Sequence, residues 1–285
     1  MKIDLGVDTL SYHCRLVTGA ITLDAVLREC AELGYDFVQY NTVHLASYDD
    51  EGLAELKRTT DELGLGVTLA GSVLGRRYEG DTVDDAVARV DEWMSVAAKV
   101  GSDYVRVSSG FYRTEMGRDL GPIVAEQEYV TESLRAIVDR LGDRGIKILL
   151  ENHSDFLPEE YLAIVRGVDS PLFEVFLDLI NPVAMLREPA PVVALLLPHA
   201  SAGHIKDYRF ESHYVEDGYH RRGFSVNYCY PGEGVADIAG LVGQIAADPR
   251  QGTYRLSVEG LDNYADVADQ RDRLGATIAL LRSLS

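Results

Sequence analysis

The chain repeats one local pattern from end to end, in which a short apolar run is followed by a longer amphipathic segment. After Thr22, apolar residues stand at positions 23, 26, 27, 30 and 33, which is the spacing of one face of an α-helix. Gly34 then stands where a helix commonly ends, and Gly64 and Gly101 occupy the same place after later helical segments. The apolar runs predict strands at 3–8, 37–40, 66–70, 104–107, 146–151, 173–178, 202–206 and 254–259.

Eight strand–helix units in 285 residues predict an α/β protein with one domain over residues 1–285, a closed (β/α)8 TIM barrel. A doubly wound open sheet is the alternative. That fold usually carries a glycine-rich turn after its first strand, and residues 8–13 (DTLSYH) contain no glycine. We expect Asp81 to be the N-cap of the helix after the third strand, and the closing helix to run from about residue 264 to 281.

The balance of charge argues against one large class of partner. The net charge is −19, from 27 Lys and Arg against 46 Asp and Glu, whereas nucleic-acid binding depends on basic residues that neutralise phosphates. Three distant cysteines without a CxxC motif predict a reducing compartment. The first residues lack the apolar run of a signal peptide, and no apolar run is long enough to cross a bilayer. We therefore expect a cytoplasmic protein that binds neither nucleic acid nor membrane.

Four metal-ligand side chains stand at the ends of four consecutive predicted strands: Glu151, Asp178, His204 and Glu259. Active sites of TIM barrels lie at the C-terminal ends of the strands. Each residue taken alone is also explained as a helix cap, a salt-bridge partner or a hydrogen-bonded core histidine. Together, four ionisable groups converging on a barrel axis would be costly without a compensating cation. The set predicts one divalent ion, with Mn²⁺ expected and Mg²⁺, Co²⁺ or Zn²⁺ as alternatives.

The sequence around these residues is similar to that of a known family. The segments 151–153 (ENH), 178–181 (DLIN), 204–207 (HIKD) and 232–237 (GEGVAD) resemble the xylose isomerase-like superfamily. That group includes sugar isomerases and epimerases, inosose dehydratases, hydroxypyruvate isomerases and endonuclease IV. The resemblance implies that the four residues bind one divalent ion and that Glu151 and Glu259 also serve as catalytic acid and base.

Two departures from family patterns narrow the choice. Tagatose and psicose epimerases usually have a histidine at the position of Asn181 and an arginine at the position of Phe210, next to Arg209. Endonuclease IV uses further histidines where this chain has Asn181 and Tyr219. These differences, and the negative net charge, argue against a simple ketose 3-epimerase and against a nuclease.

Further residues are expected to contact substrate: His153, Lys206, Arg106, His13, Asn181 and Arg209. His153 and Lys206 share the strand face of Glu151 and His204, because side chains two residues apart point the same way. For Lys206 a salt bridge to Asp178 or Glu151 is an equal alternative, and for Arg106 an ion pair inside the barrel. The aromatic-rich segment at about 207–233 is long for a connection after the seventh strand. It predicts a substrate lid or, preferably, a subunit interface, so we expect a homo-oligomer, with a hetero-complex as the alternative.

The sequence thus predicts a metal-dependent isomerase or epimerase that acts on a sugar or cyclitol through a metal-stabilised enediolate. A lyase or dehydratase, including one that cleaves 3-keto glycosides, shares the same first step and is the alternative. A non-catalytic sugar-binding barrel is a third interpretation.

Overall fold

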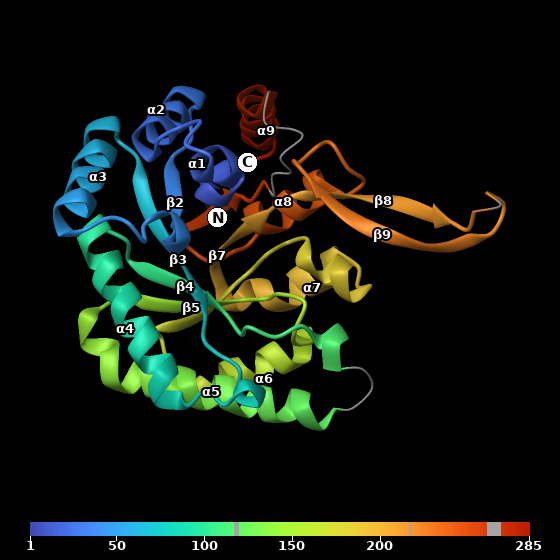
Figure 1. Ribbon diagram of the computed structural model, residues 1–285, viewed down its shortest axis with the longest axis horizontal. Coiled ribbons are helices and arrows are strands. Elements are labelled where there is room, and N and C mark those ends of the chain that lie inside the picture. Colours follow the sequence, from blue (N-terminus) through green and yellow to red (C-terminus); the bar gives the residue numbers. More distant parts are fainter. Residues whose placement is uncertain (117–119, 217, 261–268) are drawn as a thin grey trace.

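The computed structural model describes residues 1–116, 120–216, 218–260 and 269–285 (Figure 1). Eight parallel strands close into a barrel in the order β1-β10-β7-β6-β5-β4-β3-β2, which confirms the predicted TIM barrel. The barrel strands are β1 Lys2–Asp8, β2 Phe37–Asn41, β3 Gly66–Val73, β4 Tyr104–Ser108, β5 Lys147–Glu151, β6 Phe173–Phe176, β7 Ala200–Ile205 and β10 Thr253–Val258.

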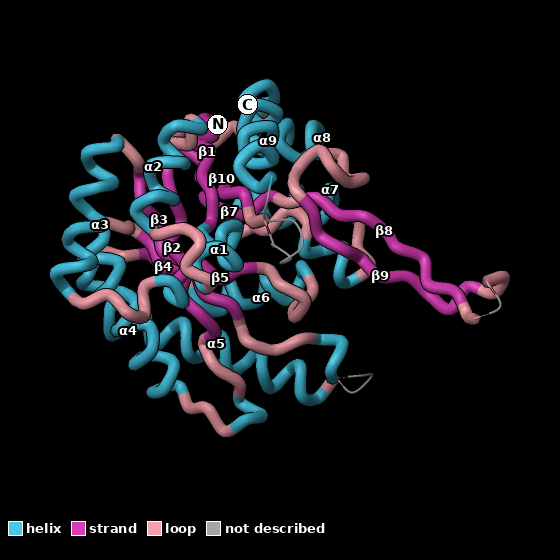
Figure 2. Tube along the Cα trace, turned by 45° about the horizontal axis from the view of Figure 1, so that its top comes forward, coloured by secondary structure: helices cyan, strands magenta, loops and turns pink. Residues whose placement is uncertain are grey.

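The helices cover the outside of the barrel, as Figure 2 shows. They are α1 His13–Val17, α2 Leu23–Leu33, α3 Asp50–Leu63, α4 Val83–Val100, α5 Gly121–Leu141, α6 Pro158–Val168, α7 Pro189–Leu196, α8 Ile238–Ala246 and α9 Gln270–Leu284. Gly34, Gly64 and Gly101 end their helices with positive φ of 86°, 68° and 86°, as predicted.

One predicted helix start differs from the structure by one residue, and another falls outside the described residues. Thr82, not Asp81, is the N-cap of α4: its hydroxyl accepts a hydrogen bond from the Asp85 N–H, and the Asp85 carboxylate accepts one from the Thr82 N–H. The Asp81 carboxylate is instead engaged by the Arg76 N–H and the Arg89 guanidinium. The start predicted for the closing helix, residues 264–268, lies outside the described residues.

Alternate residues of each strand point into the barrel, and this alternation positions the site. A buried cluster of Tyr104, Leu149, Phe176 and Ala202 fills the barrel interior. The next residue of the same parity on each of these four strands is Arg106, Glu151, Asp178 and His204. Strands β6 and β10 end two residues and one residue before Asp178 and Glu259, so these two carboxylates belong to the following loops.

The segment after β7 forms an antiparallel hairpin of β8 Asp207–Tyr214 and β9 Arg221–Cys229, which projects away from the barrel (Figure 1). Its register pairs Tyr208 with Tyr228 and Phe210 with Val226, so these side chains share one face. Phe224 lies on the same face, and Phe210 and Phe224 are 54% and 52% exposed. We call Tyr208, Phe210, Phe224, Val226 and Tyr228 the apolar hairpin face. No helix in the described part of the chain is both long and apolar enough to span a membrane.

Candidate metal centre and active site

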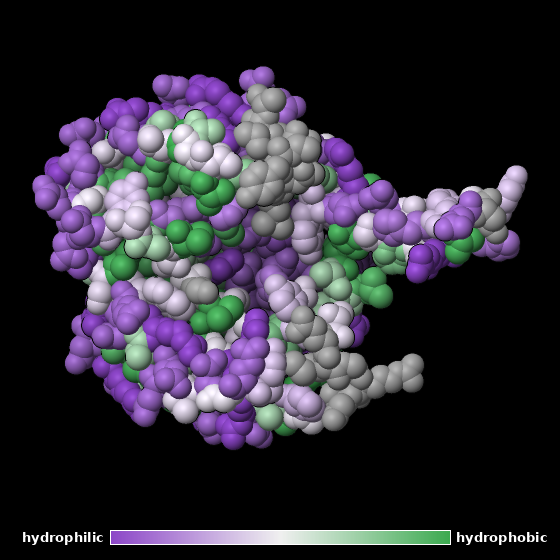
Figure 3. All heavy atoms as spheres, viewed as in Figure 1, coloured by the Kyte–Doolittle hydropathy of each residue, from purple (hydrophilic) through white to green (hydrophobic). Residues whose placement is uncertain are grey.

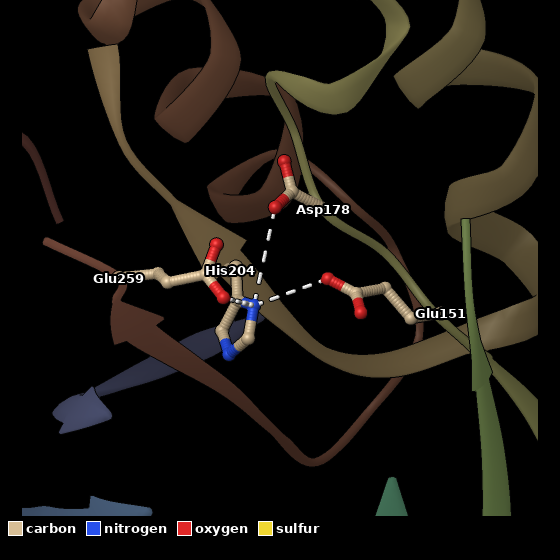
Figure 4. A group of neighbouring side chains, drawn as sticks. All are labelled: Glu151, Asp178, His204 and Glu259. Carbon is tan, nitrogen blue, oxygen red and sulfur yellow. Dashed lines mark hydrogen bonds and ion pairs between the residues drawn. The ribbon is translucent and has the colours of Figure 1, made fainter. Parts of the chain in front are cut away.

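The four side chains predicted as metal ligands meet at the mouth of the barrel (Figure 4). One ligand atom each from Glu151, Asp178, His204 and Glu259 lies within 4.8 Å of the others, and all four residues are buried. The His204 Nδ1 atom faces all three carboxylates, at 3.3 Å from Glu151 Oε1, 3.5 Å from Glu259 Oε1 and 3.9 Å from Asp178 Oδ2.

This arrangement fits a single divalent ion. Ligand atoms on opposite sides of an ion with bonds of about 2.0–2.4 Å would be separated by about 4.0–4.8 Å, which is the spread of the cluster. The Glu151 Oε2 atom is buried and accepts no hydrogen bond from the described residues, although Arg106 lies 2.7 Å away in an ion pair. Three carboxylates and one imidazole nitrogen form a donor set suited to Mn²⁺, Mg²⁺, Co²⁺ or Zn²⁺.

Two basic side chains of the protein also lie in the cluster. They bear on the sequence argument that the four ionisable groups need a compensating metal ion. The Lys206 ammonium lies 2.6 Å from Asp178 Oδ2 and 2.5 Å from Glu259 Oε2, and the Arg106 guanidinium pairs with Glu151. Both side chains are buried. The clustered carboxylates therefore do not by themselves require a metal ion, because Lys206 and Arg106 already compensate part of their charge. An entering ion would compete with Lys206 for Asp178 and Glu259.

The electrostatics of the cluster follow from these pairings. Burial opposes the ionisation of Glu151, but Arg106 and His204 outweigh it, and the pKa of Glu151 lies well below its usual value. The pKa of Glu259 is lowered in the same way, where Lys206 and His204 outweigh burial. Burial disfavours the charged form of His204, but Glu259, Asp8 and Glu151 raise its pKa to about 10. Without a metal ion, the ionised forms of Glu151 and Glu259 and the protonated form of His204 are thus favoured.

Residues of β1 and β2 contact the His204 ring on the side away from the three carboxylates of the cluster. Its Nε2 atom lies 3.4 Å from Asp8 Oδ2 and 3.0 Å from the side-chain nitrogen of Gln39. The Gln39 amide also donates to Asp8 and accepts from the Ser257 hydroxyl. This network leaves Nδ1 directed at the carboxylates. Sequence reasoning missed Asp8 and Gln39, although both share the inward parity of their strands.

Asp178 is held by the loop that follows it. Its Oδ1 atom accepts hydrogen bonds from the Ile180 and Asn181 N–H groups, both at 2.8 Å, which leaves Oδ2 facing the cluster. The Asn152 side chain bridges the two strand ends, because it accepts from the Asp178 N–H and donates to the Asp178 carbonyl. The Asn181 amide donates to the Asn152 carbonyl at 3.0 Å and lies 3.5 Å from Glu151 Oε1.

A cavity of about 540 Å³, here called the central cavity, opens above the cluster. Among its lining residues are Arg106, Glu151, His153, Asn181, Lys206 and Glu259. Four of the six predicted substrate contacts therefore reach one cavity together with both predicted catalytic glutamates. Tyr228, from the aromatic segment predicted as a lid or interface, also lines the cavity, and among the lining residues that sequence reasoning missed are Arg76 and Tyr112. The Tyr228 ring of the hairpin lies 4.8 Å from the Lys206 ammonium.

The other two predicted contacts are not among the residues that line this cavity. His13 lies beside His44, with Nδ1 3.0 Å from His44 Nε2, and His44 in turn bonds to the Thr9 hydroxyl. Arg209 lies at the base of the hairpin, where its Nε donates to the Glu233 carbonyl at 2.7 Å. A role in substrate binding remains a prediction for both residues.

Comparison with known proteins finds a matching family. The chain matches the family described as xylose isomerase-like TIM barrel over residues 27–284. It is 29% identical over 245 residues to a 3-oxo-isoapionate decarboxylase of Pectobacterium atrosepticum, covering 83% of this chain and 78% of that protein. It is 23% identical to a 3-dehydroshikimate dehydratase of Pseudomonas putida, with 83% of this chain but only 36% of that protein covered.

Solved structures share the fold at low identity. D-psicose 3-epimerase of Clostridium cellulolyticum, solved with D-tagatose, superposes with a TM-score of 0.75 at 14% identity and 99% coverage of both chains. A xylose isomerase-like TIM barrel protein of Mycobacterium smegmatis, solved in complex with magnesium, gives a TM-score of 0.66 at 19% identity, covering 98% of this chain and 97% of that one.

Proposed function

Because the chain belongs to the xylose isomerase-like TIM barrel family, we propose that it is a metal-dependent isomerase or epimerase of a sugar or another small polyhydroxylated carbonyl compound. The observation that carries this proposal is the buried cluster of Glu151, Asp178, His204 and Glu259 at the floor of the central cavity. Glu151 and Glu259 there line the same cavity, so one carboxylate can take a proton from carbon and the other, once protonated, can return one.

The two glutamates would move the proton. One carboxylate takes the proton from the carbon beside the carbonyl group, which leaves an enediolate. Return of a proton to the opposite face gives the epimer, and the other glutamate can supply it only after it has itself taken a proton from a substrate hydroxyl group or from water. Return of the first proton to the neighbouring carbon by the first glutamate gives the isomer. The low pKa of Glu151 and Glu259 keeps both ionised but makes them weak bases, so the substrate C–H must be acidified.

Positive charge close to the substrate carbonyl oxygen would make the neighbouring C–H group more acidic. A divalent ion, for which we propose Mn²⁺, would act as a Lewis acid toward the carbonyl oxygen when held by the four residues. Lys206 and Arg106 lie in the same cavity and would donate hydrogen bonds to substrate oxygens. His153 and Asn181 line the wall and would orient substrate hydroxyl groups.

A lyase is the second candidate, and a specific observation favours it. One of the curated relatives described above, at 29% identity, is a decarboxylase, an enzyme that also leaves charge on a carbon next to a carbonyl group. Arg106 and Lys206 would bind an anionic substrate such as a keto acid. Decarboxylation, dehydration or cleavage of a 3-keto glycoside would use the same cluster, with a different bond breaking beside the carbonyl group.

The test is hydrogen exchange in D₂O with Mn²⁺ and a panel of ketoses, inososes, 3-keto sugars and keto acids. We expect deuterium at the carbon beside the carbonyl group of the substrate. Glu151→Gln or Glu259→Gln should slow exchange by at least about 100-fold, the usual contribution of a positioned acid or base. Glu159→Gln, an exposed change on α6, is the matched control and should exchange like the parent protein. Full exchange in both active-site variants would remove the glutamates from the mechanism.

We also propose that two copies of this chain associate through the apolar hairpin face. Phe210 and Phe224 are half exposed on a two-stranded ribbon, and an isolated ribbon of this kind is only marginally stable in water. A partner copy would cover them. The excess of acidic residues continues to favour a small-molecule partner over nucleic acid.

A further inference from the structure

A second cavity, here called the side cavity, adjoins the central cavity. It has a volume of about 580 Å³ and lies between the ends of β2 and β3 and the middle of α4. The two cavities share three lining residues, Val73, Arg106 and Ser108. A ligand held at the metal cluster could therefore extend past Arg106 into the side cavity without leaving the protein surface.

Half of the residues that line the side cavity are apolar. Val43, Leu45, Ala46, Val73, Trp93 and Val96 contribute apolar surface. Figure 3 shows hydrophobic side chains gathered between the hydrophilic central hollow and helices α3 and α4. Among the polar lining residues, the Asn41 side-chain oxygen already accepts the Val43 N–H at 3.3 Å. Thr42, Glu92 and Ser108 also line the cavity, so a second sugar ring is the competing occupant, which the maltose arm of the test below decides.

Trp93 is built into this wall. A Cβ atom on Gly71 would lie 2.7 Å from the Trp93 ring and 3.1 Å from the Arg106 carbonyl oxygen. The indole therefore packs directly on the backbone of β3, at the place where the β3–β4 register shifts between Ala70 and Val73. A glycine in such a bulge gives the close approach that fixes the ring beside the cavity.

From this geometry we infer that the substrate is a glycoside of a keto sugar, and that the side cavity binds its aromatic aglycone. The inference rests on the proposed function, because the keto sugar is assigned to the central cavity. The central cavity alone lies within the usual size of a small-molecule site, so a free monosaccharide would leave the side cavity unused. An aromatic group there would remove the Trp93 face and the half-exposed Val43 side chain from water.

The sequence supplies a direct probe, since Trp93 is the one tryptophan of the chain. Its fluorescence reports on the side cavity without metal or turnover. We expect para-nitrophenyl β-glucoside to quench Trp93 saturably, after correction with N-acetyltryptophanamide, and phenyl β-glucoside to reverse the quenching. Glucose should do neither. Quenching that rises linearly without saturation would overturn the proposal, and reversal by maltose as strong as by phenyl glucoside would assign the cavity to a second sugar instead.

A variant that places a negative charge at the edge of the side cavity tests the site in a second way. Val43 is 54% exposed, so Val43→Glu should fold while placing a carboxylate beside the aglycone. We expect the dissociation constant of para-nitrophenyl glucoside to rise by about tenfold or more. Val124→Glu, at 50% exposure on α5 and outside both cavities, is the matched control and should bind like the parent protein. Equal affinity in the two variants would refute the assignment.

The two proposals fail separately. Metal-dependent deuterium exchange on a free keto sugar tests the chemistry of the glutamates and does not require the side cavity. Saturable quenching of Trp93 tests the side cavity and does not require the glutamates. Exchange without quenching would keep the enzyme and discard the aglycone site, and quenching without exchange would keep the binding site and discard the proposed reaction.

Discussion

Replacing Asp207 by asparagine would test how the chain holds the loop that follows the hairpin. Asp207 comes directly after Lys206 and is buried. Its Oδ1 atom accepts hydrogen bonds from the Tyr208 and Ala236 N–H groups at 2.7 and 2.9 Å. Its Oδ2 atom accepts from the Gly232 and Gly234 N–H groups at 3.1 and 2.9 Å. One carboxylate thus satisfies four backbone donors from both ends of the segment 207–236.

The cost of the substitution follows from counting acceptors. An asparagine side chain keeps one acceptor oxygen, and in either orientation its NH₂ group faces two of the four backbone donors. Each donor left without an acceptor costs about 1–3 kcal/mol when buried, and these four N–H groups are only partly buried, so the total lies near the lower bound, about 2 kcal/mol. For a protein near this size each kcal/mol lowers the melting temperature by about 2–4 °C. We therefore expect Asp207→Asn to melt at least about 4 °C lower.

The assay is urea and thermal denaturation followed by circular dichroism, with Asp237→Asn as the matched control. Asp237 is the exposed N-cap of α8, where its Oδ1 accepts the Gly240 N–H at 2.9 Å. Asparagine caps helices about as well as aspartate, so the control should change stability by less than about 0.5 kcal/mol. If Asp207→Asn is as stable as this control, the argument that Asp207 must accept four backbone hydrogen bonds is refuted.

The remaining predictions concern the metal cluster and the hairpin. EDTA should lower the melting temperature and Mn²⁺ at about 100 times its dissociation constant should restore about 2.7 kcal/mol, a response that Glu259→Gln should blunt; an unchanged melting curve would speak against a bound ion. Lys206→Met should destabilise the metal-free protein by about 3–5 kcal/mol, because it leaves Asp178 and Glu259 without their partner. Its stabilisation by Mn²⁺ should therefore exceed that of the parent protein in the same melting assay, and an equal response would show that the lysine does not compete with the ion. The pKa of His204 is raised from 6.5 to about 10, so protonation of His204 stabilises the metal-free fold. This stabilisation is fully present below pH 6.5 and is lost as the pH rises through 10. Since an ion must displace that proton, calorimetry should find Mn²⁺ binding about tenfold tighter per pH unit between about pH 7 and 9, and a pH-independent affinity would contradict the assignment of Nδ1 as a ligand. Replacing Phe210 and Phe224 together by serine should convert the oligomer to monomer in light scattering after size exclusion, and a parent protein that is itself monomeric would remove the proposed contact.

Much of the fold was determined within short stretches of sequence. The helix on 23–33 follows from apolar spacing over a few turns, and Gly34 ends it because glycine adopts positive φ without strain. The convergence of Glu151, Asp178, His204 and Glu259 was also predictable, because strand alternation and the closure of a parallel barrel place equivalent strand ends together. The N-cap of α4 was assigned one residue too early, since Asp81 and Thr82 are both good caps and only the fold engages Asp81 elsewhere.

The tertiary structure alone decided which charges meet. The Lys206 ammonium lies between Asp178 and Glu259, and Arg106 pairs with Glu151, because barrel closure makes neighbours of strand ends that are 28 to 53 residues apart in sequence. Arg209 bonds to the Glu233 carbonyl instead of lining the central cavity. The side cavity likewise joins Val43 and Trp93 only because the turn after β2 and helix α4 both pack against β3. Periodicity fixes the direction of a side chain relative to its own strand or helix, whereas its partner depends on barrel closure and on rotamers set by neighbours distant in the chain.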